Sequence, residues 1–447
     1  MRTAGRWGTL AVAVLLTLFV SVASRGAGGD GVYALVGGRV MTVSGGVLAD
    51  GTVILRDGLI DAVGAGLQPP PDARVIDVKG LTLTPGIIDG FGGIGLPAPA
   101  TSGPAASRSA DAPANNPLAP QAFVLDRIRL AEALKARDKG ITTALVVPRE
   151  GVLPGRSVLI NLSGDRPDAM VLLQPAFMHL HMATLPAKYP GSLMGTVAYA
   201  RQALLDAAHY RASFAAYEKA PRGHKRPRYD AALAAWQDVI AGKQVLIVTA
   251  TRENDIRRAL ALADEFKLKV AIAGAMQAQA VADTIKARRV PLLVSVNFDP
   301  PGPASFDGED EDKERRDIEA AEKNPAALHR AGVAFALVSG HAPDFLAGVR
   351  KAIDRGLPRD AALRAITLSA AEALGVSDRL GSLETGKIAN LVAWSGEPLT
   401  AEAKAKMVFV DGELFEPDEK PAPSPSPAPS PSPTPTPSPI PSPEVPR

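Results

Sequence analysis

Six histidines are the residues of this chain best suited to bind a metal ion, since its 447 residues include no cysteine. Two of them, His179 and His181, are separated by a single residue. If residues 176–182 form a strand, both rings lie on one face and can reach one metal ion. Two ligands alone do not complete a metal site. The alternative interpretation is a pair of histidines satisfied by other polar groups at a strand edge or in a loop.

His341 is the third candidate, because it follows the apolar run 333–338. A strand there would place His341 at a carboxyl end, where barrel enzymes hold their active sites. The alternative is a loop histidine whose ring bonds to the backbone. The other three histidines are expected at the surface, with His209 and His329 in helices and His224 in a basic loop.

The composition excludes several kinds of chemistry. The absence of cysteine rules out disulfides, thiolate nucleophiles, iron–sulfur clusters and cysteine-type zinc sites. The 49 basic and 47 acidic residues nearly balance, which gives no support for a nucleic-acid partner. There is no phosphate-binding loop and no Gly-x-Ser-x-Gly nucleophile elbow. The glycines within residues 90–95 do not have the spacing of a dinucleotide-binding motif.

Three kinds of pattern follow one another along the chain. Residues 30–85 hold short apolar runs separated by Gly-Gly and Asp-Gly pairs, which predict strands joined by hairpins. Residues 86–382 alternate apolar runs with helical segments such as 125–137. Uniformly apolar strands are buried on both faces, so these units predict an α/β fold with a TIM-like (β/α)8 barrel. Residues 383–416 return to strands and are expected to complete the first segment as a small composite β-sandwich.

Three stretches interrupt these patterns and are predicted to be loops or insertions. Residues 97–120 are rich in Pro, Ala, Ser and Asn, residues 219–230 carry a basic cluster, and residues 301–317 carry an acidic one. Exposed charge is common, so we interpret both charge clusters as solvated surface.

The two ends are expected to lie outside the fold. Residues 1–23 have a basic start, a short apolar core and small residues near position 23, which together predict a signal peptide. That core is shorter than the ~20 residues that span a bilayer. No membrane span is therefore expected after cleavage, and an uncleaved anchor is the alternative. Residues 417–447 are a proline-rich tail, expected to be extended, as a spacer or an inert segment. Export predicts a periplasmic or extracellular protein.

Several motifs spread over residues 33–414 point to one family. They are Gly37-Gly38-Arg39-Val40, residues 50–64, Thr84-Pro85-Gly86-Ile87-Ile88-Asp89, Gly140-Ile141-Thr142-Thr143, residues 362–375, and residues 381–392. Together they resemble the metal-dependent amidohydrolases, especially the imidazolonepropionase-like branch found among exported bacterial proteins. The resemblance implies a barrel with a composite sandwich, and hydrolysis of carbon–nitrogen bonds in amides or cyclic amides.

The resemblance also implies one or two divalent metals at the mouth of the barrel, where a metal turns bound water into hydroxide. The family has His-x-His directly after the Pro-Gly-x-Ile-Asp motif, then two further histidines and a catalytic aspartate on later strands. Asn390 also stands where the closing motif of the family usually has Asp. At the ligand positions this chain has Phe91, Gly93, Thr249, Gly274 and Ser339.

No catalytic residue is therefore assigned, and no cofactor is expected unless zinc binds at an alternative site such as His179 and His181. Two functions remain open. The first is a hydrolase of carbon–nitrogen bonds with a rearranged site. The second is a non-catalytic homologue that binds a small molecule, or that forms a homo-oligomer or a hetero-oligomer with an active relative. Fold alone does not choose between them, because function depends on the site.

Overall fold

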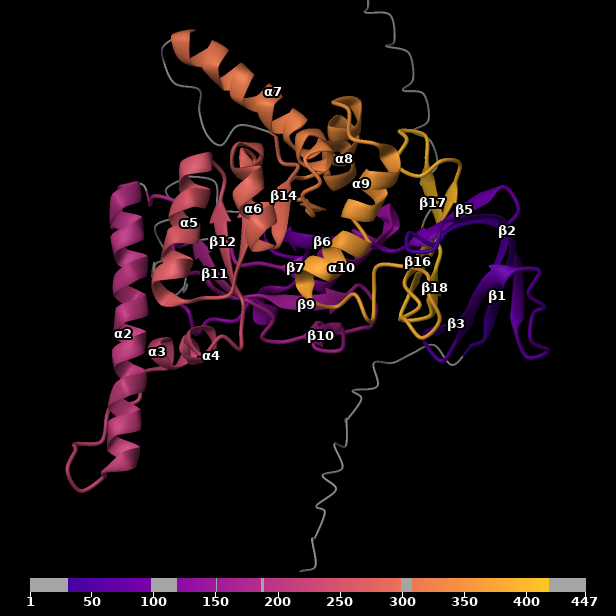
Figure 1. Ribbon diagram of the computed structural model, residues 1–447. Helices are drawn as coiled ribbons and strands as arrows, with labels where there is room; N and C mark the ends of the chain where they lie inside the picture. The colour runs from indigo at the N-terminus through magenta and orange to yellow at the C-terminus, as the bar shows by residue number, and fades with distance from the viewer. Residues whose placement is uncertain (1–30, 98–118, 150, 186–188, 299–307, 418–447) are drawn as a thin grey trace, which may run out of the picture. The chain divides into compact units, whose positions relative to one another are not determined.

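The computed structural model describes residues 31–97, 119–149, 151–185, 189–298 and 308–417 (Figure 1). The predicted leader, the proline-rich tail and most of the first predicted insertion lie outside these residues. Within the described part of the chain, no helix has the length and apolar character needed to cross a membrane.

One sheet is built from both ends of the described chain. It contains eight strands, and the two groups join where β16 pairs with β5 in antiparallel orientation. Figure 1 shows the early strands in indigo beside the late strands in yellow. The strands are β1 (Tyr33–Met41), β2 (Val47–Arg56), β3 (Leu59–Ala65), β4 (Arg74–Asp77), β5 (Leu81–Pro85), β16 (Leu391–Ser395), β17 (Lys404–Val410) and β18 (Glu413–Phe415).

The hairpin between β2 and β3 follows directly from the sequence. Asp57 and Gly58 both have positive φ values, 52° and 77°. Two residues in that region form the type I′ turn that Asp-Gly favours, and its twist matches the flanking strands. The expected sheet region made from both chain ends is therefore present, although its strands form one hydrogen-bonded sheet instead of the two sheets of a sandwich.

The remaining strands form two sheets that hold the parallel part of the fold. One has the order β15-β14-β13-β12-β11-β8 and the other the order β10-β9-β7-β6. Strands β11 to β15 pair in parallel, and so do β6 and β7. Their bounds are β6 (Ile87–Gly92), β7 (Ile141–Val146), β8 (Gly155–Arg156), β9 (Val158–Asn161), β10 (Val171–Leu173), β11 (Met178–His181), β12 (Leu246–Ala250), β13 (Val270–Gly274), β14 (Leu292–Ser295) and β15 (Ala336–Val338).

These two sheets meet at two seams. At the first, β8 and β9 flank Ser157, whose amide donates to the carbonyl of Phe177 at 3.0 Å. At the second, the amide of Gly340 donates to the carbonyl of Phe91 at 3.0 Å, which brings the ends of β6 and β15 together. The described strands do not form one closed ladder. The pairing also departs locally from the parallel order expected for a (β/α)8 barrel, because β8 and β9 run antiparallel to β11 and β7.

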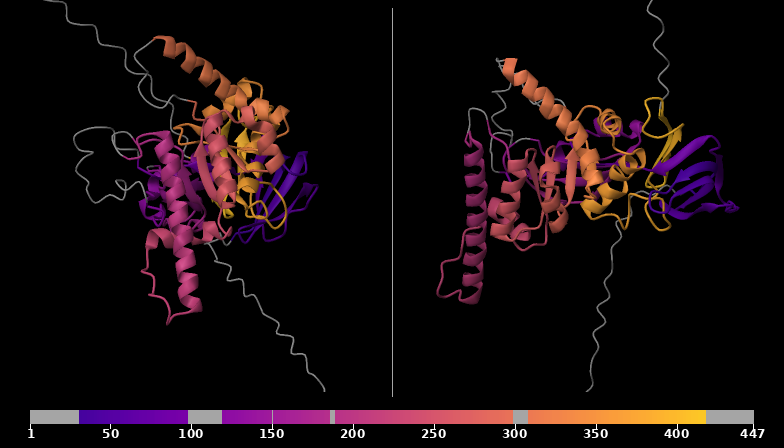
Figure 2. Two further views of the ribbon diagram at one scale, coloured as in Figure 1. Left: turned by 60° about the vertical axis from the view of Figure 1, so that its left-hand side comes forward. Right: turned by 45° about the horizontal axis from the view of Figure 1, so that its top comes forward.

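Helices follow the parallel strands and cover them. The long helix α2 runs along one flank and contacts α5, as the views in Figures 1 and 2 show. The α-helices are α1 (Leu130–Leu134), α2 (Leu193–Lys219), α3 (Ala231–Ala235), α4 (Gln237–Ile240), α5 (Glu253–Phe266), α6 (Ala282–Arg288), α7 (Gly308–Arg330), α8 (Phe345–Asp354), α9 (Arg359–Ala365) and α10 (Leu368–Leu374). Short 3-10 turns occur at Leu125–Arg127, Arg137–Lys139 and Ala278–Val281.

Two predictions from the sequence need correction. The helix expected over 125–137 is broken into short pieces, because the amide of Arg129 donates to the carbonyl of Gly95 at 2.9 Å instead of continuing a helical ladder. The acidic stretch expected as a loop is helical from Gly308 onward. The basic stretch 219–230 does connect α2 to α3 and is largely exposed.

The closing motif, residues 381–392, contains a small network of charged and polar side chains. Lys387 is buried and its ammonium lies 2.7 Å from the Glu384 carboxylate, while the Ser382 hydroxyl donates to that carboxylate at 2.6 Å. Hydrogen bonds from Lys387 first, and then Ser382, lower the pKa of Glu384 to about 2. The network therefore stabilises the folded state only while Glu384 is ionised.

Glu384→Gln should remove a pH-dependent part of the stability. A carboxylate whose folded pKa is depressed contributes stability above its unfolded value of 4.5, and this contribution is lost as the pH falls towards about 2. Glu384 is half-exposed, so we expect the substitution to lower the free energy of unfolding at pH 7 by on the order of 1 kcal/mol. Urea unfolding at pH 7 and at pH 3 measures the effect. Glu132→Gln, in an exposed pair with Lys135, is the control. Equal pH slopes for wild type and Glu384→Gln would contradict the prediction.

Candidate functional site

The five positions at which the related family would hold metal ligands lie at the carboxyl ends of strands. Phe91 lies near the end of β6 and is followed by Gly93, while Thr249 lies in β12 and Gly274 ends β13. Ser339 directly follows β15. Parallel strands present their carboxyl ends on one side, where α/β enzymes place their chemistry. The structure therefore has these five positions at the ends of strands, where the sequence analysis expected them.

Phe91 occupies the centre of this region. Its side chain is 3% exposed, and its ring lies 5.9 Å from the ring of His179 and 5.7 Å from the ring of His341, measured between centroids. An apolar ring therefore lies next to two imidazoles that the sequence places 162 residues apart. Phe91 belongs to the buried apolar cluster inside the strands, so its role in packing is clear.

Beside Gly93, the second of these five positions, lies the side chain of Arg149. Arg149 follows β7. A methyl group built on Gly93 would lie 2.5 Å from Nη2 and 2.6 Å from Nε of Arg149. The guanidinium of Arg149 therefore takes the space that a side chain at position 93 would need. Its Nε is buried without a hydrogen-bond partner, and burial lowers its pKa. A half-buried cation therefore lies beside the position at which the resemblance would place a metal-binding side chain.

The three candidate histidines are brought into one neighbourhood. Burial first, and then the charges of His181 and His341, lower the pKa of His179 well below its ordinary value. Burial lowers the pKa of His181 to about 4, partly offset by a hydrogen bond to the backbone of Gly151. Burial and then the charge of Arg149 lower the pKa of His341 to about 3. All three imidazoles are therefore neutral at pH 7.

Several ring nitrogens in this neighbourhood have no partner. Both nitrogens of His179, Nε2 of His181 and Nδ1 of His341 are buried without a hydrogen bond, as is the hydroxyl of Thr249. Buried polar atoms are nearly always paired with protein, water or ligand. The interpretation of His179 and His181 as histidines satisfied by other protein groups therefore fails for His179. Unpaired polar atoms concentrated in one place indicate a site that water or a ligand would occupy.

The donor set does not fit the metal of the related family. Phe91 and Gly93 provide no ligand atom, and in the part of the chain that the structure describes no group of three His, Cys, Asp or Glu side chains is arranged to hold a metal ion. The ring of Phe91 lies beside both His179 and His341. The carboxyl group of the nearby Asp89 already accepts hydrogen bonds from the backbone amides of Phe91 and Ser339.

Asp89 is a buried carboxyl that positions the ends of β6 and β15. Its Oδ1 accepts a hydrogen bond from the Ser339 amide at 2.9 Å and a longer one from the Phe91 amide at 3.4 Å. Burial raises its pKa, although the hydrogen bonds from Ser339 oppose that shift. Sequence reasoning missed a site role for both Asp89 and Arg149. Two features of the sequence could have indicated these roles. Asp89 is a carboxylate within the motif of residues 84–89, and Arg149 is a charged residue just after the apolar run 144–147.

A small cavity opens beside these groups. Its volume is about 230 Å³, and its lining includes Asp89, Gly93, Arg149, Ser339 and His341. Exposed Lys135 and Lys139 also line it. The cavity therefore combines three cationic side chains with a single acid, and that acid has a raised pKa.

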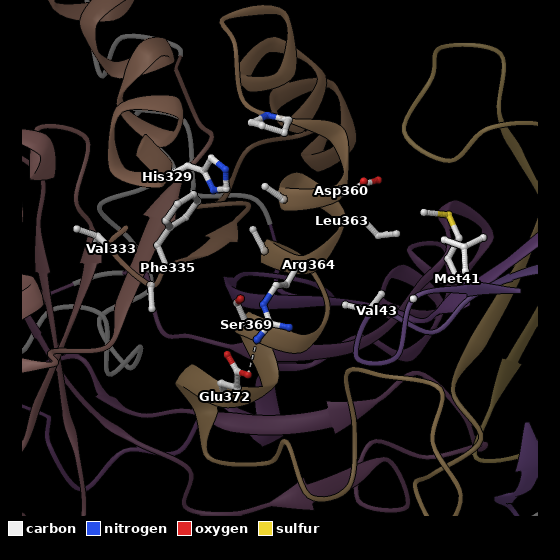
Figure 3. Close-up of a pocket in the computed structure, with 16 residues that line it drawn as sticks. Met41, Val43, His329, Val333, Phe335, Asp360, Leu363, Arg364, Ser369 and Glu372 are labelled. Atoms are coloured by element: carbon white, nitrogen blue, oxygen red, sulfur yellow. Dashed lines mark hydrogen bonds and ion pairs between the residues drawn. The ribbon is translucent and has the colours of Figure 1, made fainter. Parts of the chain in front are cut away.

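A larger cavity lies elsewhere and is mainly apolar. It has a volume of about 610 Å³, and Figure 3 shows Phe335, Leu363 and Met41 on its walls with the ion pair of Arg364 and Glu372 inside it. Its residues 333–335 precede β15, so it lies at the amino ends of the strands. Conserved chemistry in such folds lies at the carboxyl ends. We therefore take the smaller cavity as the candidate site.

Comparisons with known proteins agree with this architecture. Residues 309–415 match the model of the Amidohydrolase family. The structure of an amidohydrolase from Thermotoga maritima MSB8 is similar with a TM-score of 0.75 and 23% identity, covering 86% of this chain and 100% of that one. The likeness at this identity establishes the fold. That fold is a TIM-like barrel with a sheet domain.

Two curated relatives match over short segments. A dihydroorotase from Anaeromyxobacter dehalogenans (strain 2CP-C) is 41% identical over 58 residues, which is 13% of each chain. Amidohydrolase tasK from Hapsidospora irregularis is 39% identical over 62 residues, 14% of this chain and 6% of that one. The matches thus span a small part of the length of either relative. The similarity to the Amidohydrolase family thus covers residues 309–415, and hydrolases are among the proteins that this chain resembles.

Proposed function

We propose that this protein binds a small molecule at the carboxyl ends of its parallel strands, without the metal-dependent hydrolysis of the related family. The observation that carries the proposal is the guanidinium of Arg149 in the space beside Gly93. A fixed cation at that place repels a divalent metal, and it also blocks the space for a histidine at position 93. The unpaired imidazoles nearby support binding of a ligand with polar groups.

The second candidate is a hydrolase of carbon–nitrogen bonds with a rearranged site. It is favoured by the unpaired ring nitrogens of His179, His181 and His341, since neutral imidazoles are common metal ligands. For these residues to hold one zinc ion together, their rings must move, because among the described residues no group of three His, Cys, Asp or Glu side chains is arranged to bind a metal ion. This rearrangement is the distinguishing requirement of the second candidate.

Protein purified without chelators should contain less than about 0.1 equivalents of zinc, as expected where no closed ligand set exists. It should not hydrolyse an imidazolone, a hydantoin or an acyl-dipeptide, with or without added Zn²⁺. Elemental analysis and product detection measure both outcomes. Stoichiometric zinc that is lost in His179→Ala, but kept in the exposed His224→Ala control, would establish the second candidate instead.

The proposal extends to the setting of the protein. We place it in the imidazolonepropionase-like branch and expect it to be exported to the periplasm or the cell exterior. The leader-like residues 1–23 support export, and the entry and closing motifs support the branch. A pairing with an active homologue would give a non-catalytic subunit a role, and co-purification from the native source tests it.

A further inference from the structure

The connection between α2 and α3 concentrates positive charge in one short segment. Residues 219–229, which we call the basic loop, contain five lysine and arginine side chains and no acid, whereas the whole chain has a formal net charge of only +2. The five are Lys219, Arg222, Lys225, Arg226 and Arg228. All of them are exposed, and among the described residues none forms an ion pair. The rest of the chain therefore carries a net negative charge.

The basic loop lies beyond the amino ends of the parallel strands. α2 begins near the carboxyl end of β11, where the hydroxyl of Thr196 donates to the carbonyl of Ala183 at 2.8 Å. Its 27 residues extend over about 40 Å, whereas β11 and β12, with four and five residues, extend over roughly 13–17 Å. The excess length carries the loop past the strands. Figures 1 and 2 show it at the far end of α2, away from the sheets.

The basic loop is anchored at both of its ends. At the start, the amide of Ala220 donates to the carbonyl of Ala216 at 3.1 Å, which continues the hydrogen bonding of α2. At the end, the side chain of Asp230 accepts from the amide of Leu233 at 3.0 Å and so caps α3. Two prolines within the loop restrict φ further. The loop therefore has less conformational freedom to lose on binding than a free linker would have.

We propose that the basic loop docks this protein on an anionic lipid surface, with its cations over the headgroups and the ring of Tyr229 in the interface. Tyr229 follows Arg228 and is 71% exposed. A tyrosine ring suits the boundary between membrane and water, because its body is apolar and its tip is polar. A protein docked in this way turns the carboxyl ends of its strands, with their cavity, away from the membrane.

The shape of the loop favours a membrane over a nucleic acid. Proteins that hold single strands do so in a positively charged groove lined by aromatic rings. The basic loop protrudes instead, and the cavities at the two ends of the strands have no lining residue from it. A protruding tip can touch a flat surface without a collision of the rest of the molecule. Each Lys or Arg near an anionic leaflet strengthens binding by about fivefold.

Sedimentation of the full-length protein with vesicles tests the proposal. Wild type should bind vesicles of equal parts phosphatidylglycerol and phosphatidylcholine far more tightly than vesicles of phosphatidylcholine alone. The ratio of the two partition coefficients is the readout, because a contribution from residues 1–23 is common to all variants. The preference should disappear when the salt is raised from about 0.1 M to about 1 M, since the Debye length falls from about 10 Å to about 3 Å. Equal binding to both vesicles at low salt would overturn the proposal.

Two triple variants with the same net charge separate the loop from the charge of the whole protein. The loop variant combines Lys225→Gln, Arg226→Gln and Arg228→Gln. It should lower the ratio by about a hundredfold, because three fivefold factors multiply. The control variant combines Arg252→Gln, Lys269→Gln and Arg359→Gln, at exposed positions outside the loop. It should keep most of the wild-type ratio. Equal losses in the two variants would refute a role for the loop.

Two further measurements distinguish a lipid surface from other anions. Tyr229→Ser should lower partitioning into the anionic vesicles severalfold, since the ring no longer enters the interface. Unchanged partitioning would contradict the placement of this ring. Oligodeoxythymidylate, added at the same phosphate concentration as the anionic lipid, should leave most of the protein on the vesicles. Displacement of the protein by the oligonucleotide would assign the basic loop to nucleic acid and overturn the proposal.

Discussion

Asp89→Ala should destabilise the protein by about 2–4 kcal/mol, since two buried backbone amides lose their acceptor. These amides belong to Phe91 and Ser339, so the change weakens the contact between β6 and β15. Urea unfolding at pH 7 measures the loss. Because the same contact positions Phe91 beside two imidazoles, the effect should also appear as altered ring signals of His179 and His341.

Asp89→Asn is the matched control, because its amide oxygen can replace Oδ1 as the acceptor. Asp89→Asn should lower the free energy of unfolding by no more than about 1 kcal/mol. Burial raises the folded pKa of Asp89, so wild type should lose stability as the pH rises from the unfolded value of 3.8 through the folded value. Asp89→Asn should not show this loss. An alanine variant as stable as the asparagine variant would contradict the assigned role.

Asn390→Asp should destabilise the protein by about 3 kcal/mol, although it restores the residue usual in the related family. The amide nitrogen of Asn390 donates to Thr143 at 3.1 Å and to Asn161 at 3.0 Å, and its oxygen accepts from the amide of Asp411 at 2.8 Å. A carboxylate cannot donate, and it would face the oxygen of Asn161. It would also lie near a second buried acid.

The double variant Asn390→Asp with Asp411→Asn tests the electrostatic part of this loss. Asp411 already has its pKa raised by burial, and it accepts hydrogen bonds from Asn161 and Ser163. Asparagine is tolerated at its positive φ of 53°. Because it removes the charge at position 411, the double variant should have a free energy of unfolding about 1 kcal/mol higher than that of Asn390→Asp. Strict additivity of the two single changes in denaturant unfolding would show that charge repulsion is absent.

The sequence predicted what depends on local pattern and on the order of segments. The hairpin at Asp57-Gly58 needs only the left-handed conformations of two adjacent residues. The carboxyl-end positions of Phe91 and Ser339 follow from apolar strands in a βα order. The composite sheet follows from strand-like segments at both ends, although sequence does not reveal whether such strands hydrogen-bond as one sheet or pack as two.

What the sequence could not predict depends on contacts between distant segments. Arg149 is one of 49 basic residues, and only the fold places its guanidinium against Gly93. The predicted helix over 125–137 breaks because Gly95 offers a competing acceptor. Histidines far apart in sequence meet around Phe91 for the same reason. Local propensity contains no information on these partners.

The sheet shared by the two ends of the described chain also constrains how the protein is made. Strand β5 emerges from the ribosome early, yet its partner β16 is synthesised roughly three hundred residues later. Non-local strand pairing of this kind is slow because a long loop must close first. The nascent chain therefore keeps an unfinished sheet edge until β16 has been synthesised.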